Sequence, residues 1–304
     1  MSGWSESDMP SLSGRVAIVT GANRGLGLVI ATRLAAHGAR VVLPVRDPAR
    51  GEGAAAQIRA QVPGAEVEVD TLDVADLGSV ARFAQAFGAR HARCDLLVNN
   101  AAAILAPKGR TRDGFETHLG TNFFGAFALT GHLLDRLEAA PAARVVNCAS
   151  LAHRMTPGLD LDDLEMERVA YKEMDAYGRS KLALLLFTRE LDRRLRARGS
   201  GVIAVAAHPG YTNTNPNVGG FFMRLATRIF AQSPQMGALP ALYAATAPGV
   251  AGGEYYGPSG VKELTGPPKR VDARPEAKDD VAAARLWEIA QQRTGVRWPA
   301  AWKP

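Results

Sequence analysis

The chain has 304 residues, of which 47% are hydrophobic and 22% charged, an ordinary balance for a globular protein with a sizeable core. Its net charge of +6 is modest, and no apolar run approaches the roughly 20 residues that span a bilayer. These values favour neither a nucleic-acid-binding protein nor a membrane-spanning one. Cys94 and Cys148 form no disulfide framework and no metal-binding spacing, which predicts a cytoplasmic protein without a metal site.

Short apolar strands alternate with helices along most of the chain. Residues 1–13 are expected to be a flexible tail without a secretory signal, and residues 14–304 a single domain. Strands are expected at 15–20, 40–45, 65–70, 95–100, 144–149, 202–207 and, at the sheet edge, 254–256. Helices are expected at 26–37, 50–62, 79–90, 115–137, 177–198 and 279–293, whereas the acid-rich residues 151–173 are expected to be irregular. This alternation predicts an α/β fold with one doubly wound parallel sheet and helices on both faces.

A glycine-rich turn joins the first predicted strand to the first predicted helix. Gly21, Gly25 and Gly27 would allow a tight turn and a close approach of the backbone to a ligand. The unpaired N–H groups of the helix N-terminus would then face a pyrophosphate. The spacing Gly-x3-Gly-x-Gly departs from the usual Gly-x-Gly-x-x-Gly pattern, so an ordinary strand–helix turn without a ligand is the alternative.

Three polar side chains predict proton transfer. Tyr177 and Lys181 are four residues apart on a predicted helix and therefore share a face. The lysine ammonium would lower the pKa of the Tyr177 phenol, which is ordinarily about 10. Ser150 directly follows a strand, at the sheet edge where open α/β folds bind ligands. Taken singly, the first two could be an ordinary surface pair, and Ser150 an ordinary turn residue.

Together with other segments, these motifs resemble the short-chain dehydrogenase/reductase family, whose members have a Rossmann fold. The resemblance extends over residues 14–295. The segments that resemble family motifs are 20–27 (cofactor loop), 73–74 (adenine contact), 99–102 (Asn-Asn-Ala-Gly turn) and 208–214 (nicotinamide segment). The residues that match the catalytic tetrad are Asn122, Ser150, Tyr177 and Lys181. Ala102 stands where the family usually has glycine, so the backbone there is expected to approach the cofactor slightly differently.

This resemblance implies hydride transfer between a nicotinamide and a substrate carbonyl carbon. Tyr177 would exchange the proton on the substrate oxygen, and Ser150 would hydrogen-bond that oxygen. Lys181 would hold the nicotinamide ribose and lower the pKa of the tyrosine, while Asn122 would anchor a water that relays protons. The implied cofactor-contacting residues are Gly21, Asn23, Arg24, Gly25, Leu26, Gly27, Arg46, Asp73, Val74, Asn100, Ala101, Tyr177, Lys181, Pro209, Gly210, Thr212 and Thr214.

The end of the second predicted strand bears on cofactor choice. NAD sites of this fold usually place a carboxylate about 20 residues past the glycine loop, where it binds the ribose 2′-hydroxyl. Val45 occupies that position here, Arg46 follows it, and Arg24 lies inside the glycine loop. Both arginines resemble positions used by NADP-preferring members, which predicts that NADPH is preferred over NADH. The alternatives are that Arg46 merely pairs with Asp47, or that Asp47 itself reaches the ribose.

Further segments resemble the branch that contains retinol dehydrogenases and related soluble bacterial oxidoreductases. The acidic stretch between Ser150 and Tyr177 is longer than in many members, and residues 45–51 and 284–288 also resemble this branch. Membrane-anchored members carry an apolar N-terminal segment that residues 1–13 do not resemble. By analogy, residues 211–235 would be a substrate lid containing a helix at 219–230; a core helix and a membrane-surface helix are the alternatives.

The combined prediction is an NADP(H)-dependent oxidoreductase that interconverts an alcohol and a carbonyl on a lipophilic or secondary-metabolite substrate. One alternative is an NAD-linked alcohol dehydrogenase of the same family. The other is a catalytically silent dinucleotide-binding regulator, against which the presence of Ser150, Tyr177 and Lys181 argues. The substrate, the physiological direction and the formation of a homo-oligomer are left open, and no nucleic-acid partner is expected.

Overall fold

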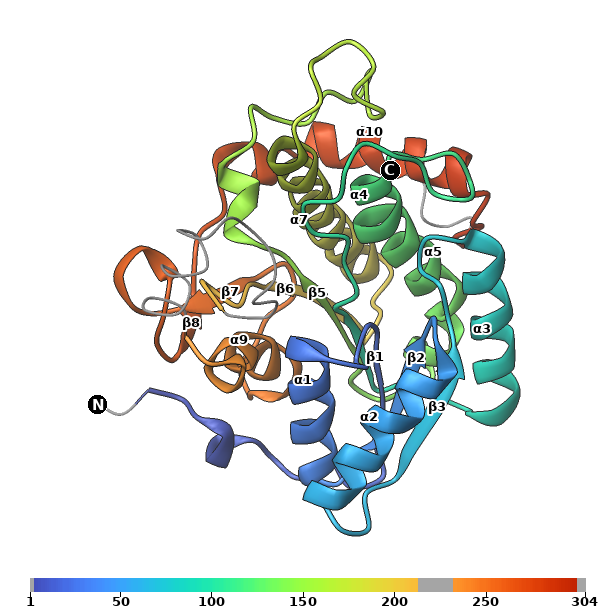
Figure 1. Ribbon diagram of the computed structural model, residues 1–304, viewed down its shortest axis with the longest axis vertical. Coiled ribbons are helices and arrows are strands. Elements are labelled where there is room, and N and C mark those ends of the chain that lie inside the picture. The colour runs from blue at the N-terminus through green and yellow to red at the C-terminus, as the bar shows by residue number, and fades with distance from the viewer. Residues whose placement is uncertain (1–2, 213–231, 300–304) are drawn as a thin grey trace.

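Eight strands form one sheet within the residues that the computed structural model describes, 3–212 and 232–299. Their order is β3-β2-β1-β4-β5-β6-β7-β8, and helices cover both faces (Figure 1). The strands are β1 (Val16–Val19), β2 (Arg40–Val45), β3 (Val67–Thr71), β4 (Leu96–Asn99), β5 (Arg144–Cys148), β6 (Ile203–Ala207), β7 (Tyr255–Pro258) and β8 (Pro268–Arg270). Neighbouring strands are parallel except for β7 and β8. The predicted doubly wound α/β sheet is confirmed, with an antiparallel edge strand beyond the predicted last one.

The helices divide between the two faces of the sheet (Figure 1). One face is covered by α3 (Leu77–Arg90), α4 (Thr117–Leu119), α5 (Gly125–His132), α6 (Leu134–Glu138), α7 (Glu173–Ala197) and α10 (Asp280–Thr294). The other is covered by α1 (Gly25–Ala36), α2 (Pro48–Gln61) and α9 (Pro234–Thr246). The short 3₁₀ helices are η1 (Glu6–Asp8), η3 (Leu151–Arg154), η4 (Val261–Glu263) and η5 (Pro275–Lys278). The order of the strands reverses between β1 and β4, which is where open α/β sheets form their ligand crevice.

Alternate strand residues fill two separate cores. Ile18 and Leu97 point into the core under α5 and α7, whereas Val19 and Val98 point into the core under α1 and α9. All four side chains are fully buried. Burial on both faces explains why the strands are continuous apolar runs in the sequence rather than alternating ones.

An aromatic cluster fixes the C-terminal helix α10 against α5 and α7. The rings of Trp287 and Trp298 lie 4.5 Å apart, and Phe127 of α5 lies 5.1 Å from Trp287 and 5.2 Å from Trp298. Phe187 of α7 closes the cluster at 5.9 Å from Trp287. Helix α10 and Trp298 thereby pack against α7, the helix that carries Tyr177.

The single helix predicted for 115–137 is instead a series of short segments. After α4 comes the π-helix η2 (Gly120–Phe124), then α5 and α6, separated by Leu133 with φ −95° and ψ 0°. The wider π turn contains Asn122. Such turns are rare and are often found at functional sites. The predicted helix is therefore present as a helical run over residues 117–138, but the prediction lacked the π turn at Asn122 and the break at Leu133.

The N-terminal residues pack against the sheet instead of forming a loose tail. Leu12 is fully buried and Met9 is 6% exposed, and both belong to the core under α1 and α9. The Leu12 N–H donates to the His37 carbonyl at 2.8 Å. Trp4 meets Tyr243 of α9 edge-on at a ring distance of 5.2 Å. The three apolar side chains explain why residues 4–12 are held against the protein.

Other boundaries differ from the prediction in ways that affect the site. Helix α7 begins at Glu173, so Tyr177 lies in its second turn rather than at its start. Helix α9 and strand β8 were not predicted. The helix expected at 219–230 and most of the expected lid lie outside the described residues. In the part of the chain that is described, no helix is both long and apolar enough to cross a bilayer.

Candidate active site

The glycine loop lies between β1 and α1, at the carboxyl edge of the sheet. Gly21 and Gly25 have φ values of +67° and +58°, a backbone region that favours glycine, and α1 begins at Gly25. A Cβ on Gly27 would lie 2.6 Å from the backbone carbonyl oxygen of Gly21 and 2.5 Å from Nδ2 of Asn100, so only glycine lets α1 pack this closely against the loop and the end of β4. The loop therefore has the close helix–strand packing that its sequence predicted.

Thr20 joins the two strands that flank the point of strand reversal. Its hydroxyl accepts hydrogen bonds from the backbone N–H groups of Asn100 and Ala101, both at 2.9 Å. The Asn100 side chain in turn donates to the Thr20 carbonyl at 2.8 Å. Thr20 belongs to the segment that resembles the cofactor loop but was not predicted as a site residue; its position at the end of a strand is the signal that could have identified it.

The residues predicted to contact the adenosine end lie on neighbouring loops. Asp73 and Val74 follow β3, where the Asp73 carboxylate accepts from the Ala75 N–H at 3.0 Å. Arg24 occupies the N-cap position of α1 without a capping hydrogen bond from its side chain, and Arg46 follows β2; both side chains are exposed. Arg46 has no hydrogen bond or ion pair within the described part of the chain.

Asp47 is engaged with α2 rather than with Arg46. Its carboxylate caps the helix by accepting from the N–H groups of Ala49 at 3.1 Å and Arg50 at 3.3 Å. It also forms an ion pair with the Arg50 guanidinium at 3.2 Å. Asp47 therefore does not pair with Arg46, and reaching a ribose would cost it these capping bonds.

Ser150, Tyr177 and Lys181 converge beyond the end of β5. Ser150 directly follows the strand and caps η3, and its hydroxyl is close enough to the Tyr177 hydroxyl to influence its pKa as a hydrogen-bond partner. Lys181 is 3% exposed and donates from Nζ to the Cys148 carbonyl at 2.7 Å. The same Nζ lies 5.7 Å from the centre of the Tyr177 ring. The fold thus brings Ser150 next to Tyr177 and Lys181, from which it is distant in the sequence.

Burial dominates the electrostatics of this pair. It raises the pKa of Tyr177, and the hydrogen-bonding influence of Ser150 opposes the rise without overcoming it. Burial also lowers the pKa of Lys181 to about 8. The expectation that the pKa of Tyr177 lies below its ordinary value beside Lys181 is therefore wrong for this structure. The desolvation of the phenol raises its pKa by more than the Ser150 hydrogen bond lowers it.

Asn122 is also buried in this cluster, and its side chain makes three hydrogen bonds to protein. Its Oδ1 accepts from the Ala103 N–H at 2.7 Å, and its Nδ2 donates to the Ala103 carbonyl at 3.0 Å and to the Ser180 hydroxyl at 2.9 Å. The Ser180 hydroxyl donates to the carbonyl of Tyr177 at 2.7 Å. A water anchored at Asn122 would therefore bind the second lone pair of Oδ1 or the backbone of the π-helix.

The predicted nicotinamide segment follows β6. His208 accepts at Nδ1 from the Gly210 N–H at 3.1 Å, and burial lowers its pKa to about 3. The Thr212 hydroxyl donates to the Pro209 carbonyl at 2.6 Å. Pro209, Gly210 and Thr212 therefore form a hydrogen-bonded turn at the same edge of the sheet as Ser150, whereas Thr214 lies outside the described residues. Among residues 3–212 and 232–299, no group of three or more His, Cys, Asp or Glu side chains could hold a metal.

Comparisons with known proteins agree with this geometry. Residues 15–160 match the family model described as short chain dehydrogenase. Retinol dehydrogenase 12 of Homo sapiens is 38% identical over 292 residues, which cover 94% of this chain and 88% of that protein. Dehydrogenase/reductase SDR family member 13 of Bos taurus is 40% identical over 297 residues, covering 95% of this chain and 75% of that protein.

Solved structures show the same relationship. The crystal structure of an uncharacterized protein from Mycobacterium paratuberculosis is 40% identical, with a TM-score of 0.83 and coverage of 98% of this chain and 100% of that one. The Pseudomonas aeruginosa RhlG/NADP active-site complex is 26% identical, with a TM-score of 0.61 and coverage of 81% and 94%. The chain therefore belongs to the short-chain dehydrogenase/reductase family of oxidoreductases, among its retinol-dehydrogenase-like members.

Proposed function

We propose that this oxidoreductase uses NADP(H) to interconvert an alcohol and a carbonyl on a lipophilic substrate, with Tyr177 as the proton donor and acceptor. The observation that carries the proposal is the convergence of Ser150, Tyr177 and Lys181 at the carboxyl edge of the sheet. The names of several relatives specify retinol, an alcohol with a long apolar chain. A lipophilic substrate is the choice that these names support.

The chain's own residues are suited to the proton half of this reaction. A bound nicotinamide would supply or accept the hydride at the substrate carbon. Because burial raises the pKa of Tyr177, its phenol is protonated at neutral pH and can donate to a carbonyl oxygen. The neighbouring Ser150 hydroxyl can hydrogen-bond the same oxygen. Lys181, with a pKa of about 8, keeps a proton next to the ring at neutral pH.

The proposed preference for NADP(H) rests on Arg24 and Arg46, the two arginines near the glycine loop. The close packing at Gly27 and the exposed N-terminus of α1 fit a pyrophosphate. Arg46 is exposed and has no partner in the described residues, while Asp47 is held by α2. An unpaired guanidinium beside the predicted ribose position is suited to a 2′-phosphate, which accepts charge-assisted hydrogen bonds. An engaged Asp47 is poorly placed to select NAD instead.

Tyr177→Phe should abolish most turnover while leaving NADPH binding intact, because it removes the proton donor and keeps the ring. General acid–base catalysis contributes about 10²–10⁴-fold, so kcat for carbonyl reduction should fall by at least that range. NADPH oxidation with a panel of lipophilic aldehydes and ketones measures this. Tyr243→Phe, on α9, is the control and should keep wild-type turnover. Normal kcat in Tyr177→Phe would refute the catalytic role.

Arg46→Ala should weaken NADPH binding much more than NADH binding. Removing a charged hydrogen-bond partner costs roughly 1.5–3 kcal/mol, equivalent to about tenfold or more in Kd. Titrating both cofactors into the wild type and the variant measures the difference. Arg50→Ala is a matched control, because Arg50 is also exposed but already pairs with Asp47. Equal losses for NADPH and NADH, or a wild type that prefers NADH, would contradict the assignment.

Lys181 provides a test that needs no turnover. Its pKa is about 8 in the folded chain against an ordinary 10.5, so between these values the unfolded chain holds more protons. The free-energy cost of burying the ammonium therefore has its greatest value below about pH 8 and disappears as the pH rises towards 10.5. The stability of the wild type relative to Lys181→Met should rise by roughly 3 kcal/mol over this range, at about 1.4 kcal/mol per pKa unit. Denaturant unfolding at pH 7 and pH 10.5 measures it; a difference independent of pH would show that Lys181 is not buried as a titrating group.

A further inference from the structure

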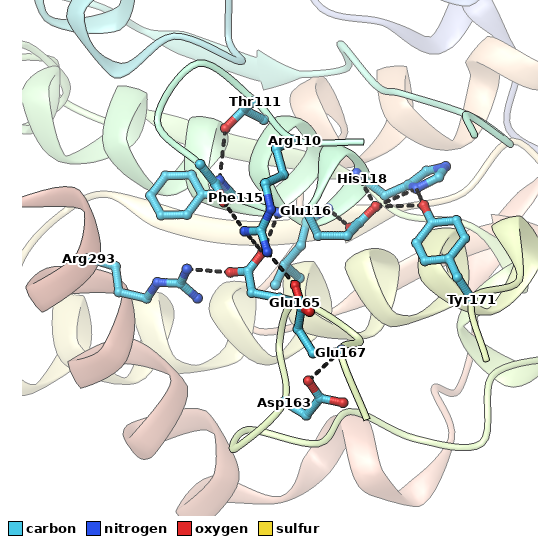
Figure 2. Close-up of polar contacts among 12 residues, drawn as sticks. Arg110, Thr111, Phe115, Glu116, His118, Asp163, Glu165, Glu167, Tyr171 and Arg293 are labelled. Carbon is cyan, nitrogen blue, oxygen red and sulfur yellow. Dashed lines mark hydrogen bonds and ion pairs between the residues drawn. The ribbon is translucent and has the colours of Figure 1, made fainter. Parts of the chain in front are cut away.

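A buried carboxylate lies outside the residues to which the proposed function gives a role. Glu116 is 3% exposed and caps α4, accepting from the N–H groups of His118 at 2.9 Å and Leu119 at 2.7 Å. The Tyr171 hydroxyl donates to the same carboxylate at 2.8 Å. Burial acts to raise the pKa of Glu116, but the hydrogen bonds from His118 and Leu119 leave it below its ordinary value. Glu116 is therefore an anion whose acceptor sites are filled by protein donors (Figure 2).

The imidazole of His118 links this carboxylate to the loop after β4. Its Nε2 accepts from the Ala106 N–H at 2.9 Å, so the ring proton must reside on Nδ1. That nitrogen faces the Glu116 carboxylate at 2.9 Å and can donate to it. His118 is fully buried, and its ring centre lies 6.2 Å from that of Tyr177. A neutral histidine with both nitrogens engaged thus lies next to the tyrosine.

These bonds join three segments that border the site. Ala106 belongs to the loop after β4, His118 to the helical run that contains Asn122, and Tyr171 to the residues just before α7. A second series of hydrogen bonds runs from Ala103 through Asn122 and Ser180 to the carbonyl of Tyr177. It joins the loop after β4 to the helical run and to α7. Two separate hydrogen-bonded connections therefore fix the loop, the π-helical run and α7 to one another.

The acid-rich stretch before α7 supports this arrangement from outside. The Glu165 carboxylate accepts from the Glu116 N–H at 2.6 Å and pairs with Arg110 at 3.5 Å and with Arg293 of α10. Figure 2 shows Glu165 between the two arginines, on the far side of Glu116 from Tyr171. The Arg293 guanidinium also lies 4.9 Å from the centre of the Phe115 ring. Glu165 therefore ties the acid-rich stretch to Arg110, to α10 and to the backbone of Glu116.

We propose that Glu116, His118 and Tyr171 form a positioning network that holds Tyr177 and the loop containing Ala106 in their reactive arrangement. The proposal rests on the proposed function, because it assigns to these residues an influence on the step that Tyr177 performs. None of the three is a catalytic residue, since their polar atoms are bonded to one another and to backbone. Their effect is transmitted through the placement of neighbouring segments, and small misplacements of reacting groups reduce rates strongly.

Tyr171→Phe tests the proposal by removing the hydroxyl that contacts the Glu116 carboxylate at 2.8 Å and Nδ1 of His118 at 3.1 Å, while keeping the ring. It should lower kcat for carbonyl reduction about tenfold and change the Kd of NADPH less than about twofold, since Tyr177 is the one predicted cofactor residue that the network contacts and the hydrogen bonds of the network go to other residues. Tyr256→Phe is a matched control: Tyr256 also donates to a carboxylate, that of Glu254, but lies in the core under α9. An unchanged kcat in Tyr171→Phe, or an equal fall in Tyr256→Phe, would overturn the proposal.

Combining Tyr171→Phe with Glu116→Gln shows whether the tyrosine acts through the carboxylate. If it does, the double variant should lose no more kcat than Glu116→Gln alone; losses that multiply would show two independent effects and contradict a shared network. Glu116→Gln keeps the volume of the side chain and removes its charge. Comparing the unfolding free energies of all variants identifies any that lose activity only by unfolding.

Hydrogen exchange of peptides covering residues 101–108 separates failure of this proposal from failure of the proposed function. Tyr171→Phe should make these backbone amides exchange at least about fivefold faster, because Ala106 is held through His118 and Glu116. Tyr256→Phe should leave them unchanged. If the wild type reduces none of the carbonyls, the proposed function fails while exchange still reports on the network. Exchange in 101–108 that is the same in Tyr171→Phe and the wild type would overturn the network.

Discussion

The burial of Lys181 next to the partly buried Tyr177, on one face of α7, is the constraint on which the site depends. An ammonium that is 3% exposed needs a strong acceptor, and the Cys148 carbonyl at the end of β5 provides one at 2.7 Å. That bond holds α7 against the end of β5. Because Ser150 lies two residues after Cys148 in the chain, the same bond brings Tyr177 beside Ser150. Desolvation at this position also raises the pKa of the phenol, so the packing of α7 keeps Tyr177 protonated at neutral pH.

Segments distant in the sequence maintain this burial. Helix α10 and the residues that follow it cover α7 through the aromatic cluster of Phe127, Phe187, Trp287 and Trp298. On the side of the helix start, Glu165 joins the acid-rich stretch to Arg293 of α10 and to the backbone of Glu116. The features that resemble the retinol-dehydrogenase branch in sequence, the long acidic stretch and the C-terminal helix, are therefore in contact with one another in the fold.

Much of the fold could be predicted because parallel strands buried on both faces are uninterrupted apolar runs. Helix α9 was missed because it is apolar nearly all round and contains Pro240, so it has no helical periodicity to detect. The π-helix around Asn122 has no signature in residue types. The lowered tyrosine pKa was a reasonable expectation from the spacing of Tyr177 and Lys181, but spacing carries no information on desolvation. The contact of Glu116 with Tyr171 joins residues too far apart in the chain for any local pattern to reveal.

Tracing deuterium from NADPH labelled at both C4 positions tests the proposed reaction most directly. The wild-type protein would be incubated with the labelled cofactor and a lipophilic aldehyde or ketone, and the alcohol product examined by mass spectrometry. One deuterium atom should appear on the carbinol carbon, with the hydroxyl proton drawn from the protein and solvent through Tyr177. An alcohol product without deuterium on carbon, or labelled NADPH that is oxidised with none of the carbonyls tested, would contradict hydride transfer to a carbonyl as the function of this site.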